Sequence, residues 1–152
     1  MAYTNVEGRQ ELLDALAEAT DEIGYALASL GAAYEELDEP TADRLEEELF
    51  GPVQVAYGRA KRSHSEFAAR HGLSGRSFEA QSPGLPSTRA RGFIDHAVEA
   101  VGAAGGYLAT LQDSPRLLEV GDRELRAGVT GVRELLGDIP HRARELTRTL
   151  GR

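Results

Sequence analysis

Apolar residues between Leu13 and Leu37 recur at alternating spacings of three and four. The seam consists of Leu13, Leu16, Thr20, Ile23, Leu27, Leu30, Tyr34 and Leu37. A repeat of this kind over successive heptads is typical of an amphipathic helix that packs against other helices. Alanines and glycines flank the seam and acidic residues lie opposite it, so a partner helix can come close. The pattern predicts a long helix that forms one wall of a helical bundle.

The same rhythm returns in the segments from Ala90 to Leu111 and from Leu125 to Leu150, and less regularly from Ala42 to His71. The four seams predict helices near 8–38, 41–71, 88–113 and 115–151. Pro52 and Pro140 fall inside the second and fourth, where a missing backbone N–H predicts kinks. We therefore expect an all-α fold: one domain spanning 1–152, built as an antiparallel four-helix bundle with kinks in the second and fourth helices.

Helix ends are marked by residues that cap or interrupt helices. Asn5 is the expected cap of the first helix, Thr41 of the second, Ser114 with Pro115 of the last, and Asp122 of a renewed turn within it. The one stretch without helical rhythm is 72–87, which is rich in Gly, Ser and Pro. It is long enough either to turn back locally or to run the length of a helix, with Leu73, Phe78 and Leu85 as anchors. Its length leaves the topology open.

Composition narrows the possible sites. The chain has no Cys or Trp and one Met among its 152 residues, and aromatic residues make up 6%. The absence of Cys excludes disulfides, thiolate metal sites and Cys nucleophiles. A core of Leu, Val and Ala favours closely spaced helices over a roomy ligand cavity. The sequence has no apolar run of membrane-spanning length and no signal-like N-terminus, so we expect a cytoplasmic protein without a membrane partner.

Charge is distributed unevenly along the chain. The net charge of −8 is made up of −12 over residues 1–58, +5 over 59–91 and −1 over 92–152. Folding the second helix back on the first predicts that the acidic group Glu18, Asp21 and Glu22 faces the basic group Arg59, Lys61 and Arg62, and that Glu7 and Glu11 face Arg70. Most of the asymmetry is then internal. An acidic chain of this kind favours protein partners over nucleic acid.

The sequence favours neither metal nor cofactor chemistry. Bundles that hold two metal ions place Glu residues and Glu-x-x-His pairs on the inward face, but no His here has Glu three residues before it, and the seams contain no acidic residue. His64 and His71 lie on the apolar stripe of the second helix, about 10 Å apart along its axis, too far to chelate one ion. We expect no metal and no cofactor.

The segment from Arg91 to His96 offers the one catalytic candidate. Arg followed after four residues by His resembles the Arg-x4-6-His motif of HEPN domains, which are small helical bundles, commonly dimeric, many of them metal-independent ribonucleases. The resemblance implies that Arg91 holds a phosphate and His96 assists transfer from a 2′-hydroxyl. Arg59 and His64 show the same spacing. A half-exposed structural His beside Asp95 is the alternative.

Arginines around the long loop suggest a weaker hypothesis. Arg76, Arg89 and Arg91 could together hold one small anionic group. They are too few to grip a long nucleic acid against the overall charge, so we expect neither tight RNA binding nor RNA cleavage.

Glycines inside the third helix point to self-association. Gly102, Gly105 and Gly106 each cost a helix about 1 kcal/mol relative to Ala. Close approach of another backbone is the usual compensation, either within the bundle or across a dimer interface. We expect a homodimer that uses the third helix, with these three glycines at the interface, or the first helix. We therefore favour a non-enzymatic scaffold that self-associates or docks a helical protein partner, with a HEPN-like ribonuclease as the alternative.

Overall fold

The computed structural model describes residues 2–84 and 89–150, and in these residues every regular element is helical. The elements in chain order are α1 (Ala2–Glu35), α2 (Glu39–Leu45), the π-helix η1 (Glu46–Phe50), α3 (Gly51–Arg70), α4 (Ala90–Asp113), α5 (Pro115–Val120), α6 (Arg123–Leu136) and α7 (Ile139–Arg148). The prediction of an all-α fold is confirmed. The expected start of the third helix at Ser87 or Thr88 lies outside the described residues.

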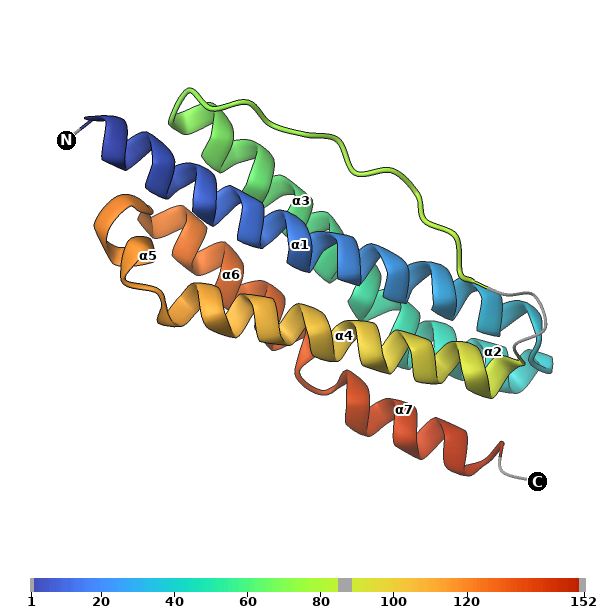
Figure 1. The fold of residues 1–152 in the computed structure, drawn as a ribbon. Coiled ribbons are helices and arrows are strands. Elements are labelled where there is room, and N and C mark those ends of the chain that lie inside the picture. Colours follow the sequence, from blue (N-terminus) through green and yellow to red (C-terminus); the bar gives the residue numbers. More distant parts are fainter. Residues whose placement is uncertain (1, 85–88, 151–152) are drawn as a thin grey trace.

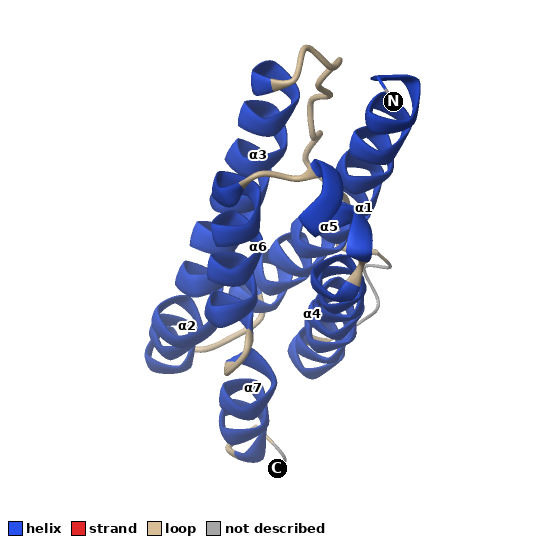
Figure 2. Cartoon of the chain, turned by 90° about the vertical axis from the view of Figure 1, so that its left-hand side faces the viewer, coloured by secondary structure: helices blue, strands red, loops and turns tan. Residues whose placement is uncertain are grey.

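The long helices pack side by side (Figures 1 and 2). Helix α1 lies along α4 and also contacts α3, while α6 lies along α3 and also contacts α4. Helices α1 and α6 run in one direction and α3 and α4 in the other (Figure 1). The short α5 packs on α1, and α7 packs on α4 and η1. Each long helix therefore has two long neighbours, and both run opposite to it.

The predicted seams form the core. All seven seam residues of α4 are buried, and so are those from Leu125 to Leu146 in the last seam. In α1 the buried surface is wider than the seam, because the flanking Ala19, Ala26 and Ala33 are also fully buried. Helix α1 has α4 on one side and α3 on another, so it must cover a broader stripe than a two-helix seam.

Two expected helix starts were wrong. Asn5 lies inside α1, which begins at Ala2, so it does not cap the helix. Thr41 does not cap the second helix, since Asp38 occupies the N-cap position in extended geometry and Pro40 falls in the first turn of α2. A proline in the first turn costs no helical hydrogen bond, because the N–H at this position has no intrahelical partner.

Near Pro52, where the sequence predicts a kink, the structure has the π-helix η1. Pro52 has no N–H to donate to the carbonyl of Glu48, four residues earlier. Nη1 of Arg142 on α7 donates to that carbonyl at 3.1 Å. The backbone group freed by the proline thus gains a partner from another helix, which ties α7 to η1.

The single kinked helix expected over 115–151 is divided into three. Ser114 and Asp122 act as N-caps as predicted, accepting hydrogen bonds from the N–H groups of Arg116 and Leu125 at 3.2 and 2.8 Å. Asp138 precedes α7 without a side-chain cap bond. Pro140 cannot donate to the carbonyl four residues back, and with Gly137 before it the helix ends and restarts.

The described part of the 72–87 loop is an extended strap. Helix α3 ends in a Schellman motif: Gly72 adopts a φ of +66°, its N–H donates to the carbonyl of Ala69, and Leu73 donates to the carbonyl of Ala68. From there the strap runs along α1 and α3 towards the start of α4 (Figure 1). The length of the loop allowed either a local turn back or a run along a helix, and the chain takes the second path. It also explains why α3 and α4, though consecutive, run parallel.

Candidate functional site

The Arg91 and His96 pair of the ribonuclease-like hypothesis lies in the first two turns of α4. Arg91 is exposed, and His96 is half-buried with its Nδ1 buried and without a hydrogen-bond partner among the described residues. His96 lines an open hollow of about 430 Å³ between α1 and α4, together with Glu22, Tyr25 and Glu99. Burial raises the pKa of Glu22, and so do the nearby charges of Glu18 and Asp21. The hollow around His96 is thus lined by carboxylates.

The proposed anion-binding arginines have different surroundings. Arg76 makes two hydrogen bonds to Asp21, at 2.9 and 3.1 Å, and its guanidinium lies 4.2 Å from the ring centroid of Phe78. Arg89 is exposed at the N-cap position of α4, two residues before Arg91. Whether the three arginines bind an anion stays a prediction, but the charge of Arg76 is already balanced by Asp21.

The expected pairing of the first two helices was wrong. Asp21 pairs with Arg76 of the strap, and Arg70 pairs with Asp122 instead of Glu7 or Glu11. None of Arg59, Lys61 and Arg62 forms an ion pair within residues 2–84 and 89–150. The pairing was predicted by folding the second helix back on the first alone, as though α3 had no other neighbour. Helix α6 is the second neighbour, and Arg59 lies against Gly131 on it.

The glycines of the proposed interface lie on the outer side of α4. A Cβ added at Gly102, Gly105 or Gly106 would meet no atom within 4 Å. Gly102 and Gly106 are exposed and Gly105 is half-buried, and Tyr107 beside them is 39% exposed. Gly102 and Gly105 line a hollow of about 190 Å³ at the break between α6 and α7, together with residues that include Leu136 and Pro140. No intramolecular contact among the described residues therefore accounts for the three glycines.

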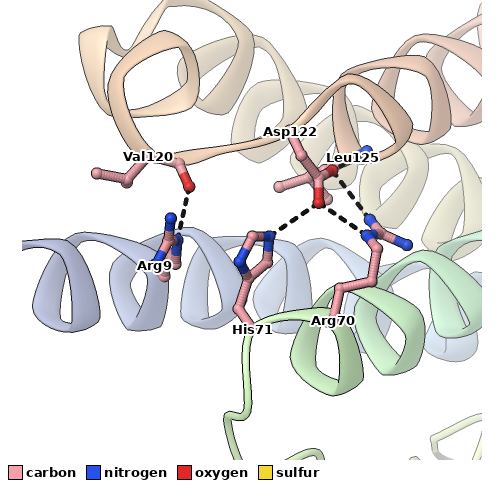
Figure 3. Close-up of polar contacts among 6 residues, drawn as sticks. All are labelled: Arg9, Arg70, His71, Val120, Asp122 and Leu125. Carbon is pink, nitrogen blue, oxygen red and sulfur yellow. Dashed lines mark hydrogen bonds and ion pairs between the residues drawn. The ribbon is translucent and has the colours of Figure 1, made fainter.

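A cluster at the junction of α3, α5 and α6 was predicted only in part (Figure 3). Asp122 caps α6 and also accepts two hydrogen bonds from Arg70, at 2.8 and 2.9 Å, and a contact of 2.9 Å from Nε2 of His71. These partners hold the pKa of Asp122 well below its usual range, against the opposing effect of its burial. Beside the cluster, Nε of Arg9 donates to the carbonyl of Val120 at 2.9 Å.

The Asp122 cluster is a structural clamp. It joins the end of α3 to the start of α6, and Arg9 joins α1 to the same turn (Figure 3). The part of this cluster that the sequence predicted was Asp122 as an N-cap. The basic residues at the end of α3 could be assigned to it only once α6 was known to be their neighbour.

A second buried histidine lies on α3. His64 is 3% exposed, and its Nδ1 has no hydrogen-bond partner among the described residues. Burial lowers its pKa, as does the charge of Arg76. The ring of Phe78 from the strap meets it edge to face, with centroids 5.3 Å apart. The sequence predicted a histidine in the core, and the structure adds that the strap covers it.

Among the described residues, no three His, Asp or Glu side chains are placed to hold a metal ion. None of the described helices combines the length and the apolar character needed to span a membrane. Comparison of the chain with protein-family models, with curated proteins and with solved structures found no match. The function must therefore be inferred from the residues themselves.

Proposed function

We propose that this protein is a non-enzymatic scaffold that self-associates as a homodimer through the outer side of α4. The observation that supports the proposal is the open space over Gly102, Gly105 and Gly106. Each of these residues weakens the helix by about 1 kcal/mol relative to Ala. Glycine removes the Cβ, which lets another backbone come close, and nothing in the described part of this chain uses that space.

A second copy of α4 is the occupant that fits this surface best. Gly102 and Gly106 are four residues apart and so share one helix face. A twofold axis through this face would bring the same residues of both copies together, as isologous dimers require. Exposed Tyr107 would then supply apolar area at the edge of the contact. A helix of another protein could use the same surface, and this is the alternative occupant.

We also propose that the helices form an antiparallel four-helix bundle. Counting α2, η1 and α3 as one helix, and α6 with α7 as another, gives an antiparallel four-helix bundle. It is supported by the contacts of α1 with α3 and α4 and of α6 with the same two helices. In such a bundle each helix covers only its inner stripe, so the outer face of α4 remains available for association. A cytoplasmic location stays a prediction from the sequence.

Light scattering coupled to gel filtration tests the proposal. We expect a dimer mass for the wild type at tens of micromolar, and a monomer mass for Gly106→Leu and for Gly105→Leu, because a bulky side chain blocks the approach of the second helix. Gly58→Leu is the matched control, since Gly58 is also a helical glycine but lies on α3. A wild type that remains monomeric at this concentration would refute the dimer.

The ribonuclease-like alternative has weaker support. The hollow around His96 is lined by Glu22 and Glu99, and carboxylates repel a phosphate. We expect no cleavage of a mixed single-stranded RNA pool. Cleavage by the wild type that both Arg91→Ala and His96→Ala abolish would contradict the scaffold proposal and establish the enzyme.

A further inference from the structure

The strap crosses α1 and α3 with few fixed backbone contacts (Figure 1). Between residues 74 and 84, no backbone group forms a hydrogen bond to another backbone group of the described chain. Two strap side chains bond to α1, and both reach Asp21: Arg76 donates to its carboxylate and Gln81 to its carbonyl. A segment held in this way can lift off the bundle without unfolding a helix, because no helical hydrogen bond has to break.

His64 of α3 lies beneath the strap. It is 3% exposed, and its Nδ1 has almost no accessible surface and no hydrogen-bond partner among the described residues. The ring of Phe78 meets the imidazole edge to face, with centroids 5.3 Å apart. Residues 74–76 of the strap line a hollow of about 470 Å³ beside the imidazole. Lifting the strap would therefore expose the imidazole to water.

Charged groups face His64 from α1 and from the strap. Burial lowers the pKa of the imidazole, and so does the charge of Arg76 on the strap. The charge of Asp14 on α1 and a hydrogen bond to the backbone of Leu13 raise it, but less. Glu18 lines the same hollow further along α1. The lowering effects prevail, so the closed strap favours the neutral imidazole.

The closed strap has no place for a second ring proton on His64. A neutral imidazole carries one N–H, and the proton that makes it a cation enters at the other nitrogen. Because the ring already bonds to Leu13, that nitrogen is Nδ1, which has no partner among the described residues. The new N–H would meet neither an acceptor nor water, and a buried unpaired donor on a charged ring is costly. Once the strap lifts, water solvates both.

We propose that the strap is a cover that opens on acidification, when His64 takes up a proton that the closed arrangement does not accommodate. An imidazole in water has a pKa of about 6.5. Below this pH the open form binds one proton more than the closed form, so the opening equilibrium should rise by about tenfold per pH unit until the closed form titrates as well. Above it the closed strap is favoured. Opening uncovers the groove between α1 and α3, where Ala68 is 2% exposed.

Thiol accessibility measures this opening, because the chain has no Cys. Ala68→Cys places a thiol beneath the strap, since a Cβ at Gly75 would lie 4.0 Å from the Cβ of Ala68. Ser65→Cys, at an exposed position of the same helix, gives the intrinsic rate of reaction at each pH. Ala104→Cys, buried in α4, reports global unfolding. The probe is 4,4′-dithiodipyridine, applied to the intact chain.

The expected signature is a pH dependence confined to the thiol beneath the strap. Between about pH 7.5 and 5.5, where Asp and Glu stay ionised, the rate of Ala68→Cys relative to Ser65→Cys should rise by about tenfold per unit below about 6.5. The relative rate of Ala104→Cys should show no such rise. These rates track the open population as long as the strap closes faster than the thiol reacts.

Substitutions in the Ala68→Cys chain separate the proton switch from the anchors. His64→Phe keeps an aromatic ring under the strap and cannot take up a proton, so the pH dependence should disappear, and His64→Gln should remove it in the same way. His141→Gln, at an exposed position of α7, is the matched control and should retain it. Gln81→Ala, which loses one anchor, should raise the rate about two- to tenfold at every pH with the slope unchanged.

Three results would overturn the proposal. The first is a relative rate of Ala68→Cys that does not change with pH. The second is an equal rise for Ala104→Cys, which would mean that the whole bundle opens. The third is a slope that persists without the imidazole of His64 or that disappears in His141→Gln. None of these outcomes depends on whether the protein dimerises through α4.

Discussion

The contacts of Asp122 predict how much its substitution lowers the free energy of unfolding, and a second aspartate in the same chain serves as a control. Its side chain is 20% exposed, caps α6 through the N–H of Leu125, and accepts two bonds from Arg70. Removing an N-cap costs about 1 kcal/mol. Losing partly buried hydrogen bonds between charged groups costs about 1.5–3 kcal/mol more. Asp122→Ala should therefore lower the free energy of unfolding by about 3 kcal/mol.

Asp122→Asn separates the two contributions. Asn is as good an N-cap as Asp, so this variant retains the bond to Leu125 and loses the charge that attracts Arg70. We expect a loss of about 1–2 kcal/mol, between wild type and Asp122→Ala. Asp138→Ala is the control, because Asp138 also occupies an N-cap position and pairs with an Arg, yet makes no cap bond and is 61% exposed. Its loss should be about 0.5 kcal/mol or less.

The pH dependence gives an independent check on Asp122. A carboxyl whose pKa is lower in the folded state stabilises the protein above the pKa of the unfolded chain, about 3.9 for Asp. The difference in stability between wild type and Asp122→Asn should therefore be constant at neutral pH and shrink as the pH falls below about 4. Urea unfolding followed by circular dichroism measures both quantities. Equal losses for Asp122→Ala and Asp138→Ala, or a difference independent of pH down to 2, would refute the reasoning.

Two further pairs of substitutions test the packing. Gly128→Ala would place a Cβ against Oγ of Ser63 and 3.1 Å from its Cβ, so we expect a loss of about 1–3 kcal/mol. The Cβ that Gly106→Ala adds has no described atom within 4 Å, so this variant should gain about 0.5–1 kcal/mol in its free energy of unfolding in dilute solution, where the monomer dominates. Urea unfolding measures both variants, and a change of the same sign in the two would contradict the packing described for these glycines. Arg142→Ala should cost about 1–2 kcal/mol, because it leaves a carbonyl of η1 without a donor. Arg148→Ala, which removes an exposed ion pair, should cost about 0.5 kcal/mol or less, and thermal unfolding compares the two.

The helices could be predicted from the sequence because their signal is local. Leu and Ala at spacings of three and four fix which face is buried, whatever the partner, and the seams of α4 and α6 are buried as expected. Caps at Ser114 and Asp122 are equally local and were also predicted. At Pro140 the sequence predicted a kink, whereas in the structure α6 ends at Leu136 and α7 begins at Ile139. The seam keeps phase through Gly137 and Pro140, so the apolar pattern alone carries no sign of a full break.

The surroundings of the candidate sites could not be predicted in the same way, because they depend on the path of the chain. Arg76 reaches Asp21 only because the strap runs along α1, and a flexible segment of this length permits other paths. Arg70 reaches Asp122 because α6 is the second neighbour of α3. The glycines differ in the same respect. Those of α6 face Ser63 and Arg59, whereas a Cβ added to Gly102, Gly105 or Gly106 of α4 would have no described atom within 4 Å.

A single introduced cysteine tests the central proposal, dimerisation through α4, most directly. The chain has no Cys, so Tyr107→Cys creates the only thiol next to Gly106 without adding a side chain where the glycines let the partner approach, and a twofold axis at this face would bring two copies of it near each other. A short bis-maleimide should convert this variant to a crosslinked dimer in high yield, while Ser65→Cys, an exposed control on α3, should remain monomeric. Equal crosslinking of the two variants, or none at Tyr107→Cys at tens of micromolar, would contradict a homodimer formed through α4.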